Sequence, residues 1–179
     1  MEQLKQNIAL FLKKSNRILK DLIKFLNDVS CEIDFKTGCM DFVPRSDDIF
    51  IVTYPRSGTT IMQMILHQIT TDGNIDFEHI YQFSPWFERF LSFDIMSIND
   101  FDKLPSPRIF KSHLSYEQIP KGPCKYIYVA RNGKDVVHSY YHLYKSHLGF
   151  KGDFSEFFIR FMQGKLLFGS WFKHVAGWW

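Results

Sequence analysis

The stretch that decides the fold runs from Ile49 to Thr60 and reads IFIVTYPRSGTT. Its first half is continuous, apolar and rich in β-branched residues, which is typical of a buried strand. A tight polar turn follows, and apolar residues then recur at helical spacing, at Ile61, Met62, Ile65, Leu66 and Ile69. The pattern therefore predicts a strand, a loop and a helix. In an open α/β sheet, a loop at the carboxyl end of a strand is where ligands bind.

The loop has the chemistry of a phosphate or sulfate site. Gly58 lets the backbone turn tightly, so that successive N–H groups and the start of the helix can face an anion. Ser57, Thr59 and Thr60 add hydroxyl donors. Arg56 adds a permanent positive charge with a planar set of donors. We therefore predict that this loop binds an anion.

Two other interpretations compete with anion binding for this loop. A Walker A loop would read GxxxxGK[ST], and this chain has neither the first glycine nor a lysine after Gly58. An ordinary nucleotide kinase or ATPase is therefore disfavoured. The second interpretation is a plain strand-to-helix turn in which serine and threonine cap the helix. The loop alone favours anion binding over capping but leaves capping open.

A second strand, turn and helix follow later in the chain. Residues 125–130 read KYIYVA, which indicates another buried strand, and this strand runs into Arg131. Aromatic and aliphatic residues recur at helical spacing after it, and Ser139 lies about one turn into that helix. The pattern places Arg131 at the carboxyl end of a strand, as the first unit does for Arg56.

A shorter segment between the two units adds acid–base groups. Residues 108–114 read RIFKSHL, which suggests a short strand that emerges into a loop with Lys111 and His113 at its tip. Because the carboxyl ends of parallel strands meet at one edge of a sheet, we expect these groups to lie close to Arg56 and Arg131.

Four blocks of this chain, in order and spacing, resemble the cytosolic sulfotransferase family, which uses 3′-phosphoadenosine-5′-phosphosulfate (PAPS) as sulfuryl donor. They are TYPRSGTT at 53–60, PRIFKSHL at 107–114, YVARNGKDVVHSYY at 128–141 and FGSWFKHVAGWW at 168–179. The resemblance runs from about residue 40 to the last residue. It implies an α/β, P-loop-type three-layer fold with a central parallel sheet, and a hydroxyl or amine of a small molecule as acceptor.

The resemblance assigns the donor-binding residues. Those that would bind the 5′-phosphosulfate are Arg56, Ser57, Gly58, Thr59 and Thr60. Arg131 and Ser139 would hold the 3′-phosphate, which distinguishes PAPS from ATP.

It also assigns the catalytic residues. His113 corresponds to the general base that removes the acceptor's proton, and Lys111 to a cation that steadies the transferring sulfuryl group. A histidine, with an ordinary pKa of about 6.5, suits proton acceptance near neutral pH. Arg56 stands where the family commonly has lysine, so we expect it to stabilise charge and not to donate a proton.

Other departures concern completeness. Ile61 stands where the family commonly has a tryptophan beside the adenine, and Ser115 replaces a proline. Family members continue beyond the position equivalent to Trp179, so we expect the C-terminal part of the fold to be missing and a sheet edge to be open to self-association. The alternative to an enzyme is therefore a truncated, catalytically impaired sulfotransferase-like protein that acts as a binding or interaction module.

Composition bounds the remaining possibilities. The chain has 179 residues, 45% of them hydrophobic, which is enough for one sizeable core, and a net charge of +3, which is too mild to imply nucleic acid. Three cysteines without C-x-x-C spacing indicate a reducing compartment, so we predict a cytoplasmic protein. His138 and His142 are four residues apart but lack a third ligand, so no metal site is expected.

The chain is expected to divide into two parts. Residues 1–30 predict a basic amphipathic helix, which could pack on the domain, on a partner or on an anionic membrane surface. Residues 40–179 would form the partial sulfotransferase domain. No apolar run is long enough for a transmembrane segment or a signal peptide.

Overall fold

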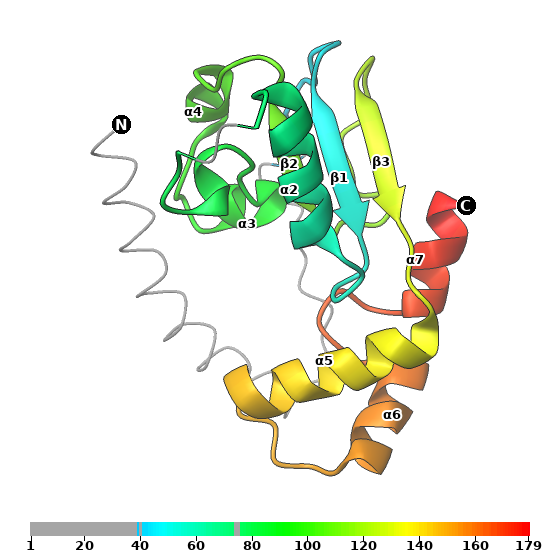
Figure 1. Ribbon diagram of the computed structural model, residues 1–179. Coiled ribbons are helices and arrows are strands. Elements are labelled where there is room, and N and C mark those ends of the chain that lie inside the picture. The colour runs from blue at the N-terminus through cyan, green and yellow to red at the C-terminus, as the bar shows by residue number, and fades with distance from the viewer. Residues whose placement is uncertain (1–38, 40, 74–75) are drawn as a thin grey trace.

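The computed structural model describes residues 39, 41–73 and 76–179 (Figure 1). The helix predicted over residues 1–30 lies outside the described residues. Within the described part, no helix is both long and apolar enough to cross a membrane.

The centre of the fold is a parallel sheet of three strands. These are β1 (Ile49–Thr53), β2 (Ile109–Ser112) and β3 (Lys125–Val129), in the order β2-β1-β3. Both neighbours pair with β1 in parallel along most of its length. The α/β class, the parallel sheet and all three predicted strands are confirmed.

Helix α2 (Thr59–Thr70) covers one face of the sheet. Side chains alternate between the two faces of a strand, and Ile51 of β1 packs on this face with Ile109 and with Leu66 of α2. The prediction of the helix is confirmed, but the five apolar residues that indicated it do not together form its buried face. Three of them, Ile61, Ile65 and Ile69, are exposed. Gln63 and His67 are buried instead.

The opposite face of the sheet packs on an aromatic cluster. Phe50 and Val52 of β1 lie in one core with side chains of two short helices, α3 (Phe87–Ser92) and α4 (Ile98–Asp102). Ring centroids within the cluster are 5.0 to 6.2 Å apart, within the range of favourable aromatic contacts. Covered on both faces, the sheet is the middle layer of three (Figure 1).

The remaining helices lie toward the carboxyl ends of the strands. Figure 1 shows α5 (Gly133–His147) and α6 (Phe154–Met162) beyond these ends, and α7 (Trp171–Trp178) beside β3. A single turn of 3₁₀-helix, η1 (Ile80–Gln82), precedes α3.

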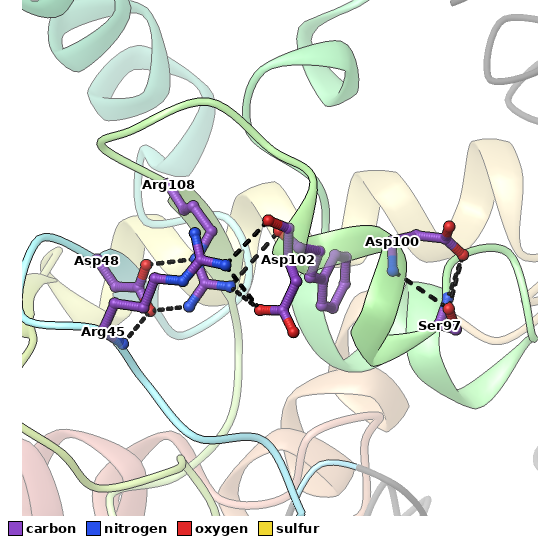
Figure 2. A network of polar contacts seen from close by, with 7 residues as sticks. Arg45, Asp48, Ser97, Asp100, Asp102 and Arg108 are labelled. Atoms are coloured by element: carbon purple, nitrogen blue, oxygen red, sulfur yellow. Dashed lines mark hydrogen bonds and ion pairs between the residues drawn. The ribbon is translucent and has the colours of Figure 1, made fainter.

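A buried ion pair fixes the start of β2 to the chain before β1 (Figure 2). Arg108 donates from Nε and Nη2 to the two carboxylate oxygens of Asp48, each at 2.6 Å, and both side chains are fully buried. Nη1 of the same guanidinium donates to Asp102 at 2.7 Å. Asp48 also accepts the backbone N–H of Arg45 at 2.7 Å. The fork therefore ties three segments together, which sets the register of β2 against β1.

Candidate active site

The loop after β1 leads into a helix that no side chain caps, so its first backbone amides stay available. Arg56 and Gly58 both adopt left-handed backbone conformations, with φ of 71° and 102°. Gly58 is the N-cap of α2, where no side chain caps the helix and no acidic residue occupies the first turn. The first amides of a helix have no acceptor within the helix, so they remain available to an anion. The interpretation as plain serine or threonine capping is wrong.

The three hydroxyl groups of the loop have different surroundings. Oγ1 of Thr59 lies 2.6 Å from Oγ1 of Thr53 on β1, which ties the start of α2 to the strand. Thr60 is exposed at the cavity described below. Ser57 is buried, and its Oγ has no hydrogen-bond partner among the described residues.

Residues of the first and last strand-to-helix junctions are in direct contact. Nη1 of Arg131, which follows β3, donates to the backbone carbonyl of Arg56 at 3.0 Å. Nε of Arg56 donates to Oγ of Ser139 on α5, also at 3.0 Å. Residues 75 and 83 positions apart therefore meet at one point beyond the sheet.

One cavity of about 630 Å³ gathers groups from all three strand ends. The predicted site residues that line it are Arg56, Gly58, Thr59, Thr60, Lys111, His113, Arg131 and Ser139. Ser57 is the one predicted site residue that does not. No aspartate or glutamate is among the described lining residues, so the cavity carries positive charge.

His113 is held as a neutral ring with a defined tautomer. Its Nδ1 lies 2.8 Å from the carbonyl oxygen of Thr53, which can only accept, so Nδ1 carries the proton and Nε2 keeps a lone pair. Burial lowers the pKa of His113 well below its ordinary value, and the charge of Lys111 adds to this. A neutral ring with a free lone pair is the form that a general base requires.

Lys111 is a cation in an aromatic setting. Its Nζ lies 3.7 Å from the centroid of the Trp86 ring and 3.4 Å from the hydroxyl of Tyr81. Burial lowers the pKa of Lys111 to about 7, although the nearby Glu88 carboxylate opposes the shift. The ammonium group therefore titrates near neutral pH when no anion is bound.

Several groups around His113 were not predicted from the sequence. Glu88 is fully buried, and its Oε1 accepts from the indole of Trp86 at 2.6 Å and from the backbone N–H of His113 at 2.9 Å. His174 of α7 donates from Nε2 to the carbonyl of His113 at 3.1 Å. The stretch PWFE at 85–88 and the block at 168–179 contain these residues, but nothing in the sequence links them to position 113.

His138 and His142 of α5 are not among the described residues that line the cavity. The rings of His138 and His142 lie 4.6 Å apart. Across residues 39, 41–73 and 76–179, the structure has no cluster of three or more histidine, cysteine or acidic side chains placed to hold a metal ion.

Comparison with known proteins identifies the family to which the chain belongs. The model of the sulfotransferase domain matches residues 46–179, and the chain therefore belongs to the sulfotransferase family. Mouse sulfotransferase 1 family member D1 is 42% identical over 148 residues, which are 77% of this chain and 50% of that protein. Human sulfotransferase 1C2 is 36% identical over 159 residues, 82% of this chain and 53% of that protein. The chain thus spans about half the length of these relatives.

Solved structures agree with the fold. Mouse sulfotransferase SULT7A1 in complex with PAP superposes with a TM-score of 0.60 at 30% identity, over 82% of this chain and 51% of that one. A retinol dehydratase complex with androsterone and the inactive cofactor PAP gives a TM-score of 0.64 at 22% identity, over 78% of this chain and 52% of that one, which supports the fold alone.

Proposed function

We propose that this chain binds PAPS and transfers its sulfuryl group to a hydroxyl or amine of a small-molecule acceptor. The observation that carries the proposal is the single cavity into which the ends of β1, β2 and β3 bring Arg56, Lys111, His113 and Arg131, without a carboxylate among the described lining residues. A polyanion with a reactive centre between its charges fits such a cavity. Membership of the sulfotransferase family and the PAP complex of a 30% identical relative support the choice of nucleotide.

The donor is assigned to the side of the cavity formed by β1 and β3. The amides at the start of α2 and the Arg56 guanidinium face the 5′-phosphosulfate, while Arg131 and Ser139 hold the 3′-phosphate. Hydrogen bonds of 3.0 Å join Arg131 to the Arg56 carbonyl and the Arg56 guanidinium to Ser139, so the three residues are already held close together where phosphate oxygens would bind.

The chemistry needs one proton transfer and one group transfer. PAPS supplies the sulfuryl group and leaves as PAP. Nε2 of His113 accepts the acceptor's proton as the acceptor oxygen or nitrogen bonds to sulfur and the bond from sulfur to the bridging phosphate oxygen breaks. Arg56 and Lys111 place positive charge beside the oxygens on which negative charge grows.

The experiment that tests this proposal is a calorimetric titration of the 179-residue chain with PAP and, in parallel, with adenosine 5′-monophosphate. We expect PAP to bind and the monophosphate, which lacks the 3′-phosphate, to bind far more weakly. No binding of PAP at millimolar concentration would contradict the donor site.

Replacing His113 by asparagine separates catalysis from donor binding. The asparagine amide can still donate to the Thr53 carbonyl, but it offers no basic nitrogen to the acceptor. We expect sulfuryl transfer to fall by about 10²- to 10⁴-fold, the range typical of general base catalysis. PAP affinity should stay close to that of the wild type. Turnover is followed with radiolabelled PAPS, and full turnover by His113→Asn would show that another group removes the proton.

The affinity for PAP should depend on the charge of Lys111. Below pH 7 its ammonium is charged, and above the pKa of about 7 the free protein must take up a proton to restore that charge on binding. We therefore expect PAP affinity to fall between pH 7 and pH 9, by up to about tenfold per pH unit. Lys111→Arg, which stays charged, should flatten the profile. Titrations at pH 7, 8 and 9 check this, and an identical slope in both proteins would refute it.

An interaction role is favoured by one observation. The outer edge of β3 has no strand partner in the described part of the chain. We propose that this edge supports self-association, which sedimentation analysis would exclude by finding only monomer.

The free thiols of Cys39 and Cys124 support a cytoplasmic location.

A further inference from the structure

One cation in the cavity has no role in the proposed donor site. Arg89, on α3, lines the cavity together with His113 and Lys111. Its guanidinium carbon lies 4.7 Å from the centroid of the Trp86 ring, the same ring that contacts the Lys111 ammonium. The side chain is only partly exposed.

The topology places Arg89 on the side of the cavity away from the 3′-phosphate residues. Trp86 forms an isolated parallel bridge with Lys111, and the N–H of Lys111 donates to the carbonyl of Pro85 at 3.0 Å. The chain just before α3 therefore continues the sheet outward from β2, while Arg131 follows β3 at the other edge. Three strand spacings of about 4.8 Å separate these two positions, roughly 14 Å in all.

The acceptor must lie on the Arg89 side of the cavity. His113 has to reach the acceptor's proton, and the rings nearest to His113 are Trp86 and Phe168, with centroids at 5.0 and 5.1 Å. Both rings also line the cavity, so they offer apolar walls to a planar acceptor. Arg89 adds a cation to the same wall.

We propose that Arg89 selects acceptors that carry an anionic group, foremost a carboxylate, in addition to the hydroxyl that receives the sulfuryl group. A guanidinium recognises a carboxylate through paired, charge-assisted hydrogen bonds. The proposal rests on the proposed function, because it concerns the acceptor side of that site.

The test uses two phenols that differ only in charge. The chain saturated with PAP is titrated calorimetrically with 4-hydroxyphenylacetate and with 4-hydroxyphenylacetamide. We expect the carboxylate to bind about tenfold more tightly than the amide, the effect of one charge-assisted hydrogen bond. Arg89→Gln should make the two affinities equal without weakening the amide, and Arg89→Lys should keep part of the preference.

Failure of this inference is distinguishable from failure of the proposed function. If PAP binds normally but the wild type binds both phenols equally, or binds neither, the selection of anionic acceptors is wrong and the donor site stands. If Arg89→Gln keeps the preference, another group recognises the carboxylate and the inference is overturned. If PAP itself does not bind, the donor site is refuted. The PAP affinity of each variant confirms that its fold is intact.

Discussion

Replacing Arg131 by alanine is expected to weaken PAP binding by about 30-fold or more. Truncating one partner of a close charge pair commonly costs about 2 to 5 kcal/mol, and Arg131 is proposed to contact the 3′-phosphate directly. The loss of its bond to the Arg56 carbonyl would also loosen the loop that holds the 5′ end. The measurement is a titration of the variant with PAP beside the wild type.

Lys125→Ala is the matched control for this change. Lys125 is exposed and lies at the amino end of β3, the strand that Arg131 follows. Its replacement by alanine removes one positive charge, as Arg131→Ala does. The PAP affinity of Lys125→Ala should match that of the wild type at physiological salt, because charges beyond a Debye length are screened. Equal losses in both variants would mean that net charge, and not the position of Arg131, governs binding.

Replacing Asp48 by alanine is expected to lower the free energy of unfolding by about 3 to 5 kcal/mol. Arg108 would remain fully buried and lose both bonds of its fork, which is the costly way to break a buried ion pair. The Arg45 N–H would lose its acceptor too. Denaturant unfolding measures the change.

The control for Asp48→Ala is a pair on the surface nearby. Lys103 and Asp100 pair at 2.9 Å, but the Lys103 side chain is 76% exposed, so Lys103→Ala should unfold close to the wild type. If Asp48→Ala is equally mild, the remaining bond from Arg108 to Asp102 is sufficient to hold the guanidinium. In that case the fork does not set the register of β2.

The three strands and the two long helices that follow β1 and β3 could be predicted from the sequence, because their apolar runs are local. The buried face of α2 could not. Gln63 points inward because its amide donates at 3.0 Å to both the carbonyl and the hydroxyl of Ser84, and His67 stacks on Phe83 with centroids 4.0 Å apart. Such partners lie outside the helix, so they override the hydrophobic pattern that favoured Ile65.

Some residues of the site could likewise be predicted from the sequence, and others could not. Arg56 and Arg131 were predicted because each follows a recognisable strand, and Ser139 because its block at 128–141 resembles the sulfotransferase family. The structure brings the three residues into contact. Glu88 and Arg89 belong to a short helix without clear periodicity, and this helix is held by the aromatic core. Their position beside His113 depends on pairing between segments 25 residues apart, which no local pattern indicates.

The strand order also has a stereochemical consequence for the proposed transfer. Because β1 stands between β2 and β3, the proposed base after β2 and the proposed 3′-phosphate site after β3 lie on opposite flanks of the central strand. We therefore expect the acceptor to attack sulfur from the flank of His113 and the nucleotide to depart along the other. Attack and departure on opposite sides define an in-line displacement, as in phosphoryl transfer. A single displacement of this kind inverts the configuration at a sulfur made chiral by oxygen isotopes.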